Sequence, residues 1–387
     1  MQAKSIKGKS TEEIKVALAE AVNDKFKPTL AIVFMSVKQD REAICNVLDE
    51  KGIQIFGATT AGEFIDGDIE EGSIVMMLLD MNPAYFRIEF LETSPATVLA
   101  DAKKLGVKGK ETFSNPAFII ANSGVSLDGE PIVEGILQGF GKSSRSSDGE
   151  VTVFGGKAAD DLALESTFVF TNRKDNDCAI AALIIDGDKI DVRGIATCGW
   201  NAIGTTKTVT KSEGNVVYTI DDKPALDMLI NYLGVEIKQE DNKEIVTFLS
   251  SWYYPLQLER ENVDPVIRTA MFANSKDRSL ICSGNVPQGS KIKFAMPPDF
   301  DSIDTVVEEC KTIKDNVEQQ ADALIMFSCV SRYLSFGMVM KEEIDQVQKI
   351  WDAPMAGFFS YGEYGRSKTG KNEYHNNTCC VVALKEI

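Results

Sequence analysis

One unit recurs three times along this 387-residue sequence and constrains its fold more than any other feature. Each copy has an apolar strand, an amphipathic helix, a second strand, a loop with glycines and a carboxylate, and a return strand. Long apolar runs of strand length are typical of strands that are buried on both faces of a sheet. The first strands begin near Leu30, Ala117 and Ala323, the loops near Gly57, Gly155 and Gly357, and the return strands near Ile74, Ala179 and Cys379.

The repeat predicts an α+β protein with mixed sheets flanked by helices, because a strand, a helix and a neighbouring strand form a crossover connection. Two such sheets stacked face to face would give a four-layer α/β/β/α sandwich. A chain of this length exceeds one ordinary core, so two domains are expected. We expect an N-terminal helix within residues 1–27, one domain over 28–222 and another over 223–387, the last opening with a helix after Asp222-Lys223-Pro224.

Composition excludes several classes of function. The formal charge of −17 argues against a nucleic-acid partner, which would require clustered lysine and arginine. No apolar run approaches the roughly 20 residues of a membrane helix, and the polar start of the chain differs from a secretory signal peptide. The eight cysteines form no C-x-x-C pair. We therefore expect a cytoplasmic protein without membrane insertion, metal or cofactor.

Polar motifs surround the third glycine-acid loop, Gly357–Gly365. Ser328-Cys329-Val330-Ser331-Arg332 ends the strand before it, where open sheets commonly place ligand-binding groups. The rigid fork of Arg332 suits a carboxylate, so we expect it either to clamp an anionic ligand or to pair with Glu363. Cys329 is either a buried filler or a nucleophile that works with His375, the single histidine of the chain.

The carboxylates of the three loops, Glu63, Asp160 and Glu363, are expected at equivalent places in the three copies. A carboxylate after a glycine turn either satisfies backbone amides or contacts a ligand. The aromatic ring of Tyr361, beside Glu363, either packs in the core or lines a pocket. The candidate residues in the first two loops are Gly57, Thr59, Glu63, Gly155, Gly156 and Asp160.

These motifs resemble the FIST family, the sensory domain named for F-box and intracellular signal transduction proteins. The resemblance implies an N-terminal and a C-terminal FIST domain, a role in sensing, and a small ligand such as an amino acid. The second motif departs from the family pattern at Lys157 and Ala159. The motifs that carry the resemblance are Gly57-Ala-Thr-Thr-Ala-Gly-Glu63, Phe154-Gly-Gly-Lys-Ala-Ala-Asp-Asp161, Asp222-Lys-Pro-Ala-Leu226, Ser328-Cys-x-x-Arg332, Gly357-Phe-Phe-Ser-Tyr-Gly-Glu363 and His375-Asn-Asn-Thr378.

Our hypothesis from the sequence is a non-enzymatic sensor that passes its signal to a separate protein such as a kinase or a chemoreceptor. An arginine and a glutamate together suit a zwitterion. Two other classes stay open: an enzyme of acyl transfer or hydrolysis that uses Cys329 with His375, and a protein-interaction scaffold without a small ligand. The expected ligand-binding residues are Arg332, Glu363, His375, Asn376, Cys329 and Tyr361.

Overall fold

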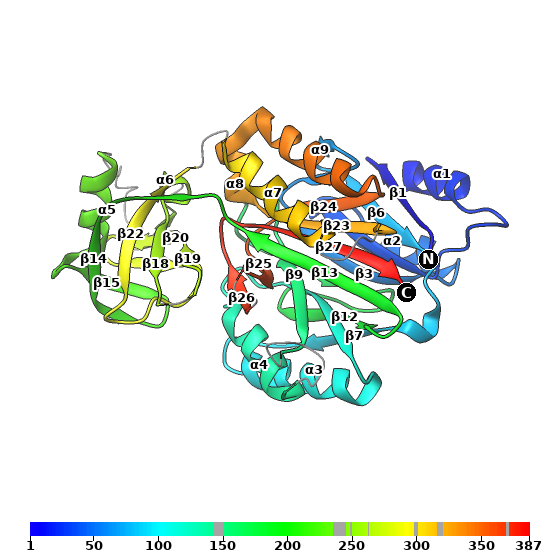
Figure 1. Cartoon of the computed structure of the whole chain (residues 1–387), viewed down its shortest axis with the longest axis horizontal. Coiled ribbons are helices and arrows are strands. Elements are labelled where there is room, and N and C mark those ends of the chain that lie inside the picture. Colours follow the sequence, from blue (N-terminus) through cyan, green and yellow to red (C-terminus); the bar gives the residue numbers. More distant parts are fainter. Residues whose placement is uncertain are drawn as a thin grey trace. The chain divides into compact units, whose positions relative to one another are not determined.

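The computed structural model describes residues 1–142, 150–234, 245–247, 250–261, 263–297, 301–315, 320–368 and 371–387 (Figure 1). It contains two compact units that do not follow chain order. The predicted division at residues 222 and 223 is a different one and stays a prediction. The first unit comprises Met1–Thr197, Ile303–Tyr374 and Thr378–Ile387, and the second comprises Cys198–Ser302 and His375–Asn377.

The first unit contains three six-stranded sheets, one for each copy of the repeat, which confirms the predicted α+β class with mixed sheets. The first sheet has the order β1 (Ala3–Gly8), β6 (Ile74–Leu79), β2 (Leu30–Ser36), β3 (Gln54–Thr60), β10 (Val169–Phe170), β11 (Asp175–Asn176). The second has the order β7 (Phe86–Glu92), β12 (Ala179–Asp186), β8 (Pro116–Asn122), β9 (Thr152–Lys157), β25 (Glu363–Arg366), β26 (Asn372–His375). The third has the order β13 (Ile190–Thr197), β27 (Cys379–Glu386), β23 (Ala323–Cys329), β24 (Met355–Ser360), β4 (Glu63–Ile65), β5 (Asp68–Glu70).

Within each sheet the strands of one copy pair as the repeat predicts. The first strand runs parallel to the second strand and antiparallel to the return strand. In the first copy, β2 pairs with β3 and β6 in this way, and the other copies repeat the arrangement with β8 and β23 as their central strands. Each sheet is therefore mixed.

The outer hairpin of each sheet comes from a different copy. The β4–β5 hairpin of the first copy adds to β24 of the third, the β25–β26 hairpin of the third adds to β9 of the second, and the β10–β11 hairpin of the second adds to β3 of the first. The exchange is cyclic, so every copy both gives and receives one hairpin.

In the first and third copies, the glycine that opens the loop makes room for the exchanged hairpin. An added Cβ at Gly57 would lie 2.2 Å from the ring of Phe170, and one at Gly357 would lie 2.2 Å from the ring of Phe64. A glycine leaves room for a cross-strand aromatic ring that any larger residue would displace. The cross-strand pairs are Gly57 with Phe170, Gly357 with Phe64, and Gly155 with Tyr364.

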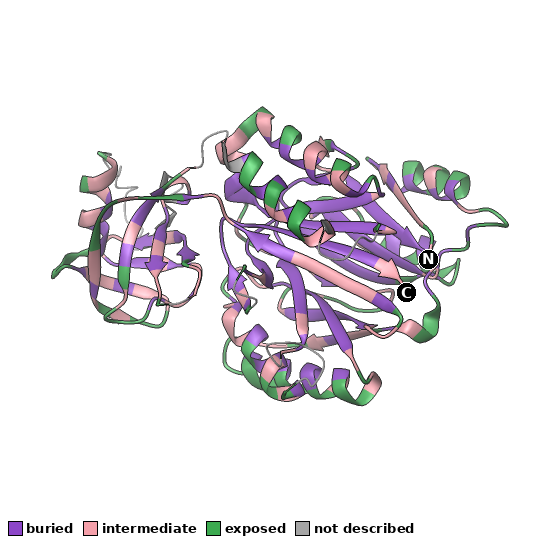
Figure 2. Ribbon diagram, viewed as in Figure 1, coloured by how far each residue is buried: buried purple, intermediate pink, exposed green. Residues whose placement is uncertain are grey.

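One central core lies among the three sheets, and helices cover their outer faces. In β2, Ile32 and Phe34 belong to the central core, whereas the alternating residues Val33 and Met35 pack with the first two helices of the chain. The strands are therefore buried on both faces (Figure 2), as their apolar runs predict. Three sheets surround one core, instead of the two stacked sheets that were expected, because each copy donates its hairpin to a neighbouring sheet.

The first two helices begin at residues whose side chains cap them. Ser10 accepts a hydrogen bond from the backbone N–H of Glu13 at 3.2 Å, and Asp40 accepts one from Ala43 at 3.0 Å, so both are N-caps. The helices are α1 (Thr11–Ala21), α2 (Arg41–Asp49), α3 (Val98–Thr112), α4 (Glu130–Phe140), α5 (Ala225–Leu233), α6 (Ser250–Tyr253), α7 (Asp301–Asp315), α8 (Val330–Phe336) and α9 (Met340–Trp351), with 3₁₀ turns η1 (Pro83–Tyr85) and η2 (Gly337–Val339).

The second unit is built on one further sheet, with α5 packed on its core. The helix α5 follows Pro224 and ends at Gly234, which has a left-handed conformation as expected for a C-cap. The strand order is β17 (Ile245–Thr247), β20 (Ala270–Asn274), β21 (Leu280–Cys282), β15 (Val216–Ile220), β14 (Asn201–Glu213), β22 (Lys291–Met296), β18 (Leu256–Glu259), β19 (Val266–Arg268), and β16 (Lys223–Pro224) pairs with β15.

Candidate functional site

The three glycine-acid loops meet in the first unit, and we call residues 59–63, 157–161 and 359–363 the three-loop junction. Backbone hydrogen bonds join each loop to the next in a closed ring, which is a second consequence of the cyclic exchange. The bonds run from the N–H of Ala61 to the carbonyl of Phe359 (3.0 Å), from Ala159 to Thr59 (2.9 Å) and from Tyr361 to Lys157 (3.1 Å).

Glu363 is fully buried at this junction, and hydrogen bonds reach both of its carboxylate oxygens. The Ser360 hydroxyl donates to Oε1 at 2.6 Å, while the hydroxyl and N–H of Thr378 donate to Oε2 at 2.8 and 3.3 Å. Burial raises the pKa of Glu363 to about 8, although these hydrogen bonds favour the ionised form. The carboxyl group therefore titrates near neutral pH.

Glu63 has the same surroundings in the first copy. It is fully buried, the Thr60 hydroxyl donates to its Oε1, and the hydroxyl and N–H of Ser73 donate to its Oε2 at 2.8 and 3.0 Å. Burial raises the pKa of Glu63 to about 7. The two glutamates thus tie the loop to the start of the return strand in their own copies.

Asp160 does not occupy the equivalent place, so this part of the sequence interpretation is wrong. Glu63 and Glu363 each pair with the residue that follows the opening glycine of the receiving strand. In the hairpin of the second copy, the residue at this position is Val169. From the opening glycine to the hairpin aromatic residue the chain advances 7 positions in the first and third copies but 15 in the second, from Gly155 to Phe170. The longer loop displaces the acid.

Asp160 instead holds this longer loop together. Its carboxylate accepts hydrogen bonds from the backbone N–H groups of Leu164, Glu165 and Ser166 at 2.7–2.9 Å. The hydroxyl of Tyr361 donates to the same carboxylate at 2.6 Å. Burial, followed by this bond, raises the pKa of Tyr361 far above its ordinary value. The contact links the second and third loops through side chains.

Cys329 lies at the end of β23 and is buried beside Glu363. Its thiol donates a hydrogen bond to the Glu363 carboxylate, which lowers the pKa of that carboxyl group. The structure therefore brings together two of the predicted residues, and Tyr361 belongs to the same loop as Glu363. A direct ligand contact by these side chains stays a prediction.

Arg332 forms its ion pair with Glu343 of α9, and both side chains are fully buried. The guanidinium also lies 5.2 Å from the ring centroid of Phe336. The carboxylate partner considered in the sequence, Glu363, is engaged with Ser360 and Thr378 instead. The buried pair fastens α8 to α9 beside the third sheet.

His375 and Asn376 belong to the second compact unit, whereas Cys329, Arg332, Tyr361 and Glu363 belong to the first. Within the second unit, Asn376 accepts a hydrogen bond from the Ser283 hydroxyl at 2.7 Å. A ligand-binding role for His375 and Asn376 stays a prediction.

Lys157 is a residue of the junction that was not selected from the sequence as a site residue. Its side chain is buried, and its Nζ donates to the carbonyl oxygens of Val125 and Leu127 at 2.8 Å each. Burial lowers the pKa of this amine to about 8. The signal that marks it is its departure from the motif, because a lysine replaces a small residue there.

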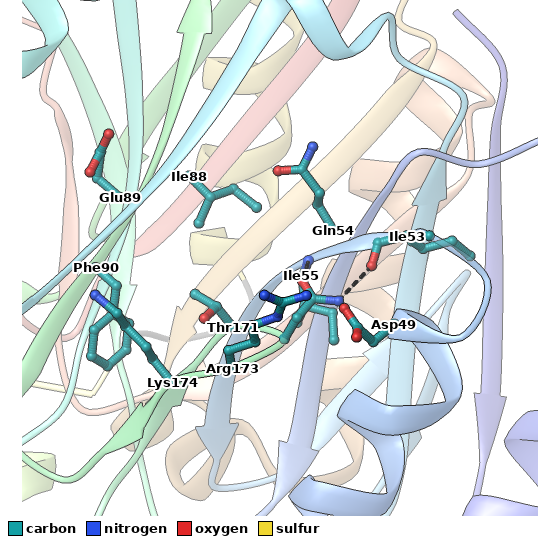
Figure 3. Close-up of a pocket in the computed structure, with 12 residues that line it drawn as sticks. Asp49, Ile53, Gln54, Ile55, Ile88, Glu89, Phe90, Thr171, Arg173 and Lys174 are labelled. Atoms are coloured by element: carbon teal, nitrogen blue, oxygen red, sulfur yellow. Dashed lines mark hydrogen bonds between the residues drawn. The ribbon is translucent and has the colours of Figure 1, made fainter.

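An open pocket of about 400 Å³ lies at the other end of β3 (Figure 3). It is lined by the end of α2 and the start of β3, by β7, and by the turn of the β10–β11 hairpin. In Figure 3, Ile88 and Phe90 line one side, Asp49 and Gln54 line the other, and Arg173 lies between them. A volume of this size suits a small organic ligand.

Two kinds of feature are absent from the described part of the chain. None of its helices has the length and apolar character needed to cross a membrane. No group of three or more histidine, cysteine, aspartate or glutamate residues with metal-binding geometry occurs within the same residues.

Comparison with known proteins identifies the class. The chain matches the FIST N domain over residues 29–223 and the FIST C domain over residues 225–366. It therefore belongs to the FIST family, whose domains are associated with signalling. It is also similar to an uncharacterized protein of Methanocaldococcus jannaschii, with 25% identity over 173 residues, 43% of this chain and 33% of that relative. The match thus spans about one third of the relative's length.

Proposed function

We propose that this chain is a cytoplasmic sensory protein that binds a small polar ligand, of which an amino acid is the leading class, and signals through a separate partner such as a kinase or a chemoreceptor. The observation that carries the proposal is the match to both FIST domains over most of the chain. An open pocket of about 400 Å³ with charged and apolar residues supports ligand binding.

A thermal-shift screen of the full chain against amino acids and small carboxylates tests the proposal. A ligand present at 100 times its dissociation constant stabilises the folded state by about 2.7 kcal/mol, which raises the unfolding temperature measurably. We expect at least one small polar compound to do so. A screen without any shift, repeated by calorimetry at millimolar concentration, contradicts the proposal.

The same screen examines the expected role of the junction. In the Glu363→Gln variant the carboxamide keeps the size of the side chain and removes its ionisation. If the shift produced by a ligand disappears in this variant and persists in Glu63→Gln, Glu363 takes part in ligand binding. If both variants respond as the wild type does, the ligand binds away from the junction.

A further inference from the structure

The three exchanged hairpins are each fastened to the receiving sheet by the same contact. A side-chain oxygen of the hairpin accepts a hydrogen bond from a backbone N–H at the start of the receiving strand. Because the contact repeats, the space next to it can be compared in the three sheets. The contacts are Ile55 N–H to Asn172 (2.9 Å), Met355 N–H to Asp66 (2.8 Å) and Val153 N–H to Asn372 (3.0 Å).

In the second sheet, charged side chains of the protein occupy the space beside this contact. The Glu150 carboxylate accepts a hydrogen bond from Asn372 Nδ2 at 2.8 Å, and the Arg366 guanidinium donates to Asn372 Oδ1 at 3.2 Å. In the third sheet, Asp345 lies so close to Gly67 that an added Cβ there would be 1.8 Å from its carboxylate. Both places are filled.

In the first sheet the corresponding place is open. Asn172 Nδ2 donates to the carbonyl of Ile53 at 2.8 Å, just as Asn372 Nδ2 donates to Val151 at 2.9 Å. The residue before Ile53 is Gly52, where the second sheet has Glu150. Among the described residues, apart from Gly52 itself and its two neighbours in the chain, no heavy atom lies within 4 Å of the place where a Cβ of Gly52 would be. This missing side chain leaves the pocket of Figure 3 accessible.

The charges around the opening are not neutralised by one another. Within the described part of the chain, the side chains of Arg173 and Asp49 form no hydrogen bond or ion pair, although both line the pocket. Lys174 lies 5.6 Å from the ring centroid of Phe90, and Glu89 pairs with Arg87 at 3.2 Å. The pocket therefore combines a cation and an anion that do not pair with each other with the apolar side chains of Ile88 and Phe90.

We propose that this pocket binds a small zwitterion with an apolar body. Its carboxylate would pair with Arg173, its cationic group with Asp49, and its apolar part would cover Ile88 and Phe90. A guanidinium binds a carboxylate through two parallel hydrogen bonds, and the opposite charges supply direction. The ligand thus takes the place that Glu150 and Arg366 fill in the second sheet. The inference rests on the proposed sensory function and assigns its ligand to a location.

Calorimetric titration of the full chain at pH 7 tests the inference with probes that share one apolar body. L-phenylalanine carries both charges, 3-phenylpropionate lacks the amine, and 2-phenylethylamine lacks the carboxylate. We expect L-phenylalanine to bind at least tenfold more tightly than either analogue. Arg173→Gln should weaken the binding of L-phenylalanine at least tenfold, and this variant should no longer bind L-phenylalanine more tightly than 2-phenylethylamine. Asp49→Asn should weaken the binding of L-phenylalanine by a similar factor, and this variant should no longer bind L-phenylalanine more tightly than 3-phenylpropionate.

Lys51→Gln is the matched control, because Lys51 is exposed, precedes Gly52 and does not line the pocket. It should leave the affinity unchanged. If the wild type, Arg173→Gln and Asp49→Asn bind L-phenylalanine with equal affinity, the proposed binding at this pocket is wrong, and the proposed sensory function is unaffected. Absence of binding by both L-phenylalanine and L-leucine would overturn the inference as well, whereas the sensory function fails only if the wider screen is silent.

Discussion

Replacement of Glu363 by glutamine should change how the stability of the protein depends on pH. The usual pKa of this group is 4.5, and burial raises it to about 8 in the folded protein. Between these values the folded state retains a proton that the unfolded state has released. The contribution to stability is complete below pH 4.5 and is lost as the pH rises to about 8. The change is about 1.4 kcal/mol for each pH unit, or about 3–5 kcal/mol over the interval.

Glutamine imitates the protonated form, and the structure can accommodate it. Its carbonyl can accept the hydrogen bonds that Thr378 donates, and its amide can donate to the Ser360 hydroxyl. That hydroxyl has a second acceptor, the carbonyl oxygen of Ser328, at 3.2 Å. The hydrogen bonds with Ser360 and Thr378 can therefore be kept, and the remaining donor to this carboxylate is the thiol of Cys329, which is a weak donor. Glu363→Gln should fold and should lack the pH dependence that the carboxyl group causes.

Chemical denaturation followed by circular dichroism at pH 5, 6, 7 and 8 measures this effect. The free energy of unfolding should fall more steeply in the wild type than in Glu363→Gln, with most of the difference gained between pH 5 and pH 8. Glu63→Gln should behave alike over an interval that ends near pH 7, and the exposed control Glu20→Gln should keep the wild-type slope. Parallel slopes for wild type and Glu363→Gln would refute the reasoning.

Two further changes test the packing. Gly139→Ala should destabilise the fold by about 1–3 kcal/mol despite the higher helix propensity of alanine, because the new Cβ would lie 2.1 Å from the carbonyl oxygen of Lys103 on α3; denaturation of a variant as stable as the wild type would contradict this contact. Arg332→Met should cost about 3–5 kcal/mol by leaving Glu343 buried and unpaired, and adding Glu343→Leu should restore most of that loss; a double variant no more stable than the single one would show that the buried charge is not the cause.

The repeat itself could be predicted from the sequence because burial on both faces of a strand leaves a continuous apolar run. The runs at Leu30–Ser36 and Ala323–Cys329 are indeed fully buried strands. The exchange of hairpins could not be predicted in this way. The ring of Phe64 could pack on the sheet of its own copy as well as on that of another, so its apolar character does not predict which sheet it joins. Only the folded chain shows that the ring fills the space above Gly357.

Part of the candidate site could also be predicted, because the repeat aligns the loops of the first and third copies. Glu63 and Glu363 were singled out correctly as equivalent acids, because their loops have equal length. Asp160 was placed wrongly. It follows its opening glycine at nearly the same spacing as Glu63 and Glu363 do, so the sequence does not reveal that the second loop is longer. Arg173 and Asp49 gave no signal, because charged residues are common in turns and at helix ends, and these two come together only when the second hairpin joins the first sheet.

Amide hydrogen exchange of the full chain, with and without saturating L-phenylalanine, tests the central claim most directly. If the first unit is the ligand-binding part of a sensor, exchange should slow in the hairpin turn over residues 171–174 and at the start of β3, both of which line the pocket. Slowing confined to other segments, or no change in any segment at saturation, would contradict the claim.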